Sequence, residues 1–384
     1  MPSSTHSHPA IPNTASFITE ARAGFIADLD STPSTAKERQ ELLTSIQSFA
    51  FQFLKAAAQP PPSHRHDINT EDDISSVEQR DVIFAAEANM DRDRDTDDLA
   101  QQGLNVLWYM FTQTAQVIDV DDAFQDRLVG LLAWTREFDG VYRQLHGIVG
   151  SAGGGAGGWD SYGFGQGLRL AWEQLVADVH LPSAMQKSRN LAAFSAKVMA
   201  VGLCKESVAG TAFWVFERAL GGDENGDGDG DGGEIFLRGL VAAVGVWLEY
   251  ASHQLLARCC SSPSCVVGGG RRKVFVENPI SLVDDLLKDQ ATAEPQCGEF
   301  SMSHWLRWRR RLQELSRDAD ADVARLAKRG FMSMIFCGRD LRVEVEGEAR
   351  FVERLQGNMY RELVRSGKDV VEGEEVEIEV DWVD

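Results

Sequence analysis

Apolar residues recur at three- and four-residue steps along most of this chain, which is the period of an α-helix. Six such residues between positions 42 and 54 would share one helix face: Leu42, Leu43, Ile46, Phe49, Phe53 and Leu54. The same spacing covers 99–117 and 124–134, and roughly 186–203, 206–220, 234–258, 280–290, 302–316 and 319–337. We therefore predict an all-α fold, an irregular bundle of about eight to ten helices joined by long flexible loops.

Polar residues mark where two of these helices should begin. Ser34 or Thr35 is a suitable N-cap for the first, and Glu38 follows Thr35 by three residues, as in a capping box. Asp121 or Asp122 is placed to cap the helix that contains residues 124–134.

Composition shifts along the chain predict its domain organisation. We expect a disordered N-terminus over 1–16, a single helical domain over 17–340 and an acidic C-terminal tail over 341–384. Segments rich in Gly, Pro, Ser or Asp predict flexible insertions in the domain at 59–70, 150–160, 221–233 and 259–273.

The acidic tail has a different period from the rest of the chain. Val376, Ile378, Val380 and Trp382 alternate strictly with acidic residues, which is typical of a strand. The sequence therefore predicts a short C-terminal β-strand, with residues 341–345 as a pairing partner.

The net charge of −21 is concentrated in three segments. Residues 67–98 contain twelve acids and three arginines, residues 223–234 contain six acids and no base, and residues 369–384 contain eight acids and no base. The rest of the chain is close to neutral. A field of this sign repels a phosphate backbone, so we expect no nucleic-acid partner.

We expect neither a secretory signal nor a membrane-spanning helix in this sequence. The first seventeen residues, MPSSTHSHPAIPNTASF, contain neither the basic nor the apolar region of a secretory signal. No uninterrupted apolar run reaches the roughly 18 residues that a membrane-spanning helix needs. We expect a cytoplasmic or nuclear protein that is not secreted and has no membrane partner.

Residues 223–234, DENGDGDGDGGE, match the spacing of a calcium-binding loop between two helices. The candidate calcium ligands are Asp223, Asn225, Asp227, Asp229, Asp231 and Glu234. Three features oppose this interpretation: Gly230 replaces the apolar residue expected at position 8, Gly221 and Gly222 interrupt the incoming helix, and the chain has no second loop of this kind. A solvated surface insertion is the favoured alternative, and calcium is the one cofactor that the sequence suggests.

The segment His304-Trp305-Leu306-Arg307-Trp308-Arg309-Arg310-Arg311-Leu312 is the main concentration of positive charge. Trp305, Trp308, Leu312 and Leu315 fall on one helix face, so we expect both tryptophans in the core. The arginines would then face solvent or pair with the chain's own acids, and residues 304–312 are a candidate docking surface for a protein partner.

Other chemical patterns are weak. His253, Cys259, Cys260 and Cys265 could supply four zinc ligands, but adjacent cysteines do not fit the paired spacing of structural zinc sites, so a loop with free thiols is expected. The sequence contains no G-x-S-x-G, H-E-x-x-H or G-x-x-x-x-G-K-[ST] motif, and no nucleophile is paired with a base at a recognisable spacing. An enzyme is therefore disfavoured, although catalytic groups can assemble from distant residues.

Four segments occur in a fixed order: QDRLVGLLAW (125–134), AFWVFERAL (212–220), the WLEYA segment with its LL pair (247–256) and the W-x-x-W…RL helix (305–312). Together they resemble a fungal family of all-helical proteins known only as a domain of unknown function, over roughly residues 100–335. The resemblance implies an all-helical fold and a loop of variable length between the second and third segments, where the Gly-Asp run lies. It implies no activity, cofactor or catalytic residue.

Three functional hypotheses follow from these patterns. The first is a helical protein-interaction or scaffold module, because the chain has amphipathic helices and no catalytic motif. The second is a calcium-responsive binding protein acting through residues 223–234. The third is a small-molecule binder or enzyme with a pocket in the helical bundle.

Overall fold

A computed structural model describes residues 14–30, 35–57, 102–145, 163–178, 182–221, 232–261, 273–274 and 300–345, and seven helical residues between 353 and 364. These residues belong to two compact units, one of Met1–Val215 with Glu224–Tyr250 and one of Phe216–Asp223 with Ala251–Asp384. A single helical domain over 17–340 stays a prediction.

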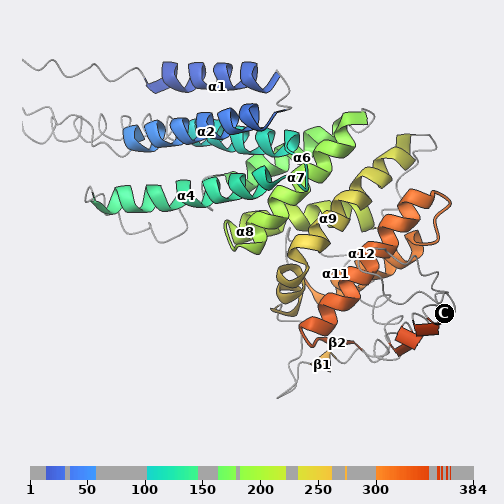
Figure 1. Ribbon diagram of the computed structural model, residues 1–384. Coiled ribbons are helices and arrows are strands. Elements are labelled where there is room, and N and C mark those ends of the chain that lie inside the picture. Colours follow the sequence, from blue (N-terminus) through green and yellow to red (C-terminus); the bar gives the residue numbers. More distant parts are fainter. Residues whose placement is uncertain are drawn as a thin grey trace, which may run out of the picture. The chain divides into compact units, whose positions relative to one another are not determined.

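The fold is all-α, as predicted (Figure 1). The first unit contains α1 (Thr14–Asp30), α2 (Ala36–Ala57), a helix over 102–117, α4 (Ala123–Leu145), α6 (Phe164–Ala177) and α7 (Pro182–Ala200). The residues of α8 (Lys205–Leu220) and α9 (Gly232–Ser261) are divided between the units. The second unit also contains α11 (Met302–Leu315) and α12 (Ala321–Asp340).

Aromatic side chains form much of the core of the first unit. The Trp108 ring meets the Phe164 ring edge to face at 5.1 Å, and the Phe111 ring stacks on Phe194 at 6.4 Å, which joins the helix over 102–117 to α6 and α7. Gly103 permits a close contact with α2, because a Cβ atom at this position would lie 2.0 Å from the Phe53 ring. Hydrophobic burial of this kind is the main stabilising contribution to the unit.

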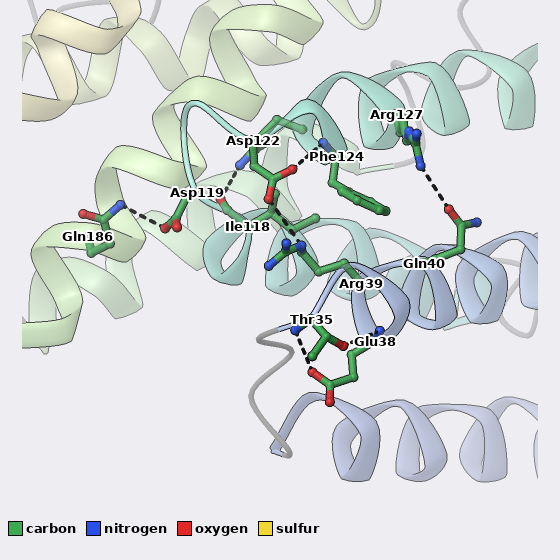
Figure 2. Close-up of polar contacts among 11 residues, drawn as sticks. Thr35, Glu38, Arg39, Gln40, Ile118, Asp119, Asp122, Phe124, Arg127 and Gln186 are labelled. Carbon is green, nitrogen blue, oxygen red and sulfur yellow. Dashed lines mark hydrogen bonds and ion pairs between the residues drawn. The ribbon is translucent and has the colours of Figure 1, made fainter.

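Two predicted helix starts are confirmed (Figure 2). Before α2, the Thr35 amide donates to Glu38 Oε2 at 2.9 Å and the Glu38 amide donates to Thr35 Oγ1 at 3.2 Å, which is a reciprocal capping box. Before α4, Asp122 Oδ1 accepts from the Phe124 amide at 2.9 Å. Local sequence signals therefore define both starts.

In the second unit, α11 packs against α12. Trp305 and Trp308 are buried, as expected, and the Trp308 ring lies 4.8 Å from the Phe216 ring. A small parallel sheet pairs β1 (Lys273–Val274) with β2 (Glu344–Val345). The segment 341–345 thus contributes to a strand, and the partner that the structure describes is β1; residues 376–382 lie outside the described part.

Several boundaries differ from the predictions. Helix α1 was not expected, and it begins at Thr14, inside the segment 1–16 predicted to be disordered. Its apolar side chains are not concentrated on one face, but Ile18 and Phe25 are buried against other helices, so tertiary contacts rather than local period stabilise it. Helical residues also occur between 353 and 364, within the predicted tail.

Helix α9 extends into two of the expected loops. It begins at Gly232 and ends at Ser261, so parts of 221–233 and 259–273 are helical. The prediction that Cys259 and Cys260 lie in a loop is wrong: both side chains are buried on this helix, because these small apolar groups continue its packed face. Residues 59–70, 150–160 and 280–290 lie outside the described residues.

Candidate functional site

A groove of about 580 Å³ lies in the first unit. Its lining comes from α1, from the helix over 102–117 and from α6 with the residue before it: Ile18, Thr19, Arg22, Gln102, Asn105, Val106, Trp108, Tyr109, Thr112, Gln113, Gly163, Gln166, Gly167, Leu170, Ala171 and Gln174. The volume is within the range of ligand-binding pockets, roughly 300–1,000 Å³.

Glycines allow α6 to begin beside the groove. Gly163 precedes the helix with φ at 81°, a left-handed conformation that side-chain-bearing residues rarely adopt. Gly167 faces Trp108, and a Cβ atom there would lie 3.3 Å from the Trp108 Cβ atom. The two long walls of the groove are therefore close at this point.

Carboxamides dominate the polar lining. Gln102, Asn105 and Gln113 stand at helical spacing on one wall, and Gln166 and Gln174 stand two turns apart on the other. Within the described chain, the four glutamine side chains have no hydrogen-bond partner. Each carboxamide offers an acceptor oxygen and two N–H donors, so both kinds of hydrogen bond are available to a ligand.

Arg22 is the single cation among the lining residues, and none of these residues is a carboxylate. Its guanidinium carbon lies 5.2 Å from the centre of the Tyr109 ring, a cation–π contact. The Tyr109 ring also meets the Phe25 ring edge to face, with the ring centres 6.5 Å apart. Packing of α1 against the helix over 102–117 thus holds an arginine beside the carboxamides.

Polar contacts between residues outside the groove lining join other helices of the first unit (Figure 2). Arg39 and Asp122 form an ion pair at 3.3 Å, with side chains only 21% and 22% exposed, and this pair joins α2 to the residue that caps α4. Arg127 donates to Gln40 at 3.3 Å, and Gln186 donates to Asp119 at 3.4 Å. These contacts have structural roles, because each joins the end or the flank of one helix to another.

Buried amides serve the C-terminal end of the helix over 102–117. Gln125 Nε2 donates to the carbonyls of Ala115 and Ile118 at 3.1 and 2.7 Å, and Asn190 Nδ2 donates to the carbonyl of Gln116 at 2.9 Å. The last carbonyls of a helix have no partner within it, so these amides satisfy groups that burial would otherwise make costly. They hold the helix that forms one wall of the groove.

The basic helix predicted as a docking surface is α11. Arg307 forms an ion pair with Glu217, and Trp308 Nε1 donates to the same Glu217 oxygen at 2.7 Å. Arg310 and Arg311 both pair with Glu314, at 3.4 and 3.0 Å. Its arginines therefore bind the chain's own acids, one of the two outcomes expected, and partner docking through 304–312 stays a prediction.

A serine and a histidine lie close together at the start of α11. Ser301 Oγ and His304 Nδ1 are 2.6 Å apart, and Ser301 Oγ also accepts from the His304 amide as the N-cap. Burial lowers the pKa of His304 below its usual value; Glu217 opposes this shift and Arg307 adds to it. The capping role accounts for the serine contacts, so this pair is not our candidate site.

The predicted calcium ligands fall almost entirely outside the described residues. Asp223, Asn225, Asp227, Asp229 and Asp231 are not described, and Glu234 is placed only as a residue of the first turn of α9. Among the residues that the structure does describe, no three His, Cys, Asp or Glu side chains form a group suited to a metal ion. The calcium site therefore stays a prediction.

The groove residues were not among the sequence-predicted sites. Their signal was present but weak: amides recur on the helix faces at 102, 105 and 113 and at 166 and 174. Glutamine on a helix is ordinarily a solvated surface residue, so spacing alone does not distinguish a site. The third wall, α1, was not predicted at all.

None of the helices in the described part of the chain combines the length and the apolar character that crossing a membrane requires. A comparison with protein families finds one whose description is "Protein of unknown function (DUF3632)" and whose model matches residues 108–312, more than half of the chain. This confirms the resemblance to a domain of unknown function. No curated protein and no solved structure matches the chain.

Proposed function

The chain belongs to this family of unknown function, and we propose that it is a helical binding module that holds an extended peptide segment in the carboxamide groove. The observation that carries the proposal is the set of carboxamides from two helices around one groove. This proposal adds a specific binding site to the hypothesis of a helical protein-interaction module.

The openness of the groove favours a peptide over an enclosed small molecule. Leu170, in the middle of one wall, is 51% exposed, and Gln102, Gln166 and Gln174 are exposed as well. Small-molecule sites usually bury about 70–90% of the ligand. An open groove instead suits a chain that is contacted along one side and continues beyond both ends.

The lengths of the two helical walls agree with binding of a short extended peptide. At about 1.5 Å per helical residue, Gln102 to Gln113 spans about 16 Å and Gln166 to Gln174 about 12 Å. An extended peptide advances about 3.3 Å per residue, so four or so residues would fit along the walls.

Carboxamides also match the chemistry of the peptide bond. Every peptide unit presents one N–H donor and one carbonyl acceptor, and a glutamine side chain can bind both. Leu170, which is 51% exposed, supplies an apolar contact for a ligand side chain. Recognition would therefore rest on the backbone, with specificity from the side chains.

Selection from a library of random peptides about nine residues long, displayed on phage, tests the proposal, since such peptides exceed the groove at both ends. We expect the full chain to enrich related sequences and the Gln113→Ala/Gln174→Ala variant to bind the selected peptides about tenfold more weakly, because about two hydrogen bonds are lost. Gln47→Ala, an exposed glutamine of α2 outside the groove, is the matched control. The absence of enrichment, or equal binding by the groove variant, would contradict the proposal.

A calcium-responsive role for residues 223–234 remains a second proposal. Its support is the ligand spacing in the sequence and the presence of Glu234, the last ligand position, at the start of α9.

A further inference from the structure

We propose that Arg22 makes the groove selective for peptides that carry a carboxylate. This inference rests on the proposed peptide binding and adds the chemical class of the ligand. It goes beyond the family match, which covers 108–312 and excludes α1.

The charge of the lining residues points to an acidic group. Arg22 is the one cation among them and faces no carboxylate among them, while the other polar groups are neutral amides and hydroxyls. A guanidinium group binds a carboxylate through two parallel, charge-assisted N–H···O bonds. A neutral ligand could not form this ion pair with Arg22, and a basic ligand would be repelled.

The Tyr109 ring holds the Arg22 cation without using its N–H donors. The contact at 5.2 Å is an attraction to the ring and consumes no hydrogen bond, so this contact leaves the N–H groups of Arg22 available. Tyr109 is itself positioned by Phe25, a buried residue one turn along α1. The arginine is therefore preorganised, which reduces the entropy lost on binding.

The negative charge of the whole chain does not cancel this local preference. The net charge of −21 lies mainly in residues 67–98, 223–234 and 369–384. At physiological salt, charges more than about 8 Å apart are largely screened, so a charge in direct contact with Arg22 has a larger effect on binding than more distant charges. The discrimination thus depends on one residue and can be tested at that residue.

Peptides selected on the full chain provide the test. For each selected peptide, affinities are compared between the original sequence and versions in which each Asp or Glu is replaced by Asn or Gln. We expect that at one acidic position the replacement by Asn or Gln weakens binding about fivefold. This corresponds to the upper end of the free energy of an exposed ion pair. Arg22→Gln should remove this difference, and Arg22→Glu should make a lysine at that position the preferred residue.

Arg127→Gln is the matched control, because Arg127 also lies over an aromatic ring, that of Phe124 at 4.6 Å, but outside the groove. Peptides with amidated C-termini distinguish a side-chain carboxylate from a terminal one. Selected peptides with no acidic preference, or a preference that survives in Arg22→Gln, would overturn this inference and leave peptide binding intact. A selection without any enrichment would overturn both.

Discussion

Glu217 shows how much a single residue of the second unit can contribute. Its carboxylate accepts from Arg307 and from the Trp308 indole, and the ion-paired side chains are 22% and 29% exposed. Because removal of one partner leaves the others partly buried without an acceptor, such a residue has a larger effect than a surface ion pair.

We predict that Glu217→Gln lowers the free energy of unfolding by about 1–3 kcal/mol, measured by urea denaturation. Glu314→Gln is the control, since Glu314 also pairs with arginines of α11 but on an exposed surface, and its loss should cost less than about 1 kcal/mol. Equal effects of the two substitutions would contradict a special role for Glu217.

The lowered pKa of His304, which lies near Glu217, predicts that the free energy of unfolding depends on pH. Its pKa in the folded state is lowered, mainly by burial, from the usual 6.5, so the folded state binds a proton less readily than the unfolded chain. The stabilisation from neutral His304 is therefore present above pH 6.5 and is lost as the pH falls through the lower pKa of the folded state.

We expect the urea midpoint of the wild type to approach that of His304→Gln as the pH falls from about 7.5 to about 5. A difference between the two proteins that does not change with pH would show that His304 titrates alike in the folded and unfolded states.

At the scale of elements, the helices of this chain begin where local signals predict them. The capping box of Thr35 and Glu38 and the Asp122 cap were recognised in the sequence because they depend on residues within one turn. Helix α1 lacked such a signal, and its burial depends on segments far away in the chain.

We predict that Thr35→Ala destabilises the protein by about 1 kcal/mol, because the Glu38 amide then loses its acceptor at the start of α2. Thr44→Ala is the control within the same helix: its hydroxyl binds the Gln40 carbonyl on an exposed surface, so a change within about 0.5 kcal/mol is expected. Urea unfolding of both variants measures the difference, and a larger loss for Thr44→Ala would contradict the cap.

At the scale of the whole molecule, calcium binding would appear as a change in stability. A loop of this kind with no partner loop would have a Kd of about 10⁻⁴–10⁻³ M, so about 10 mM calcium should stabilise the protein by about 1.4–2.7 kcal/mol. Thermal unfolding with calcium and with chelator measures this effect.

Glu234→Gln should abolish the calcium effect. Stabilisation that persists in this variant would place the site elsewhere, and an unchanged melting temperature for the wild type would show that residues 223–234 are an insertion without metal.

The sequence by itself determined the helical class, most helix boundaries, the burial of Trp305 and Trp308, and the family resemblance. These properties follow from the spacing of apolar residues and from caps, which act within a few residues along the chain. Only the tertiary structure decided that Arg22, Gln113 and Gln174 line one groove, since these residues come from three helices far apart in sequence. Their juxtaposition depends on contacts such as Trp108 with Phe164 and Phe25 with Tyr109. The spacing of residues along the chain does not specify which aromatic rings will meet in such contacts.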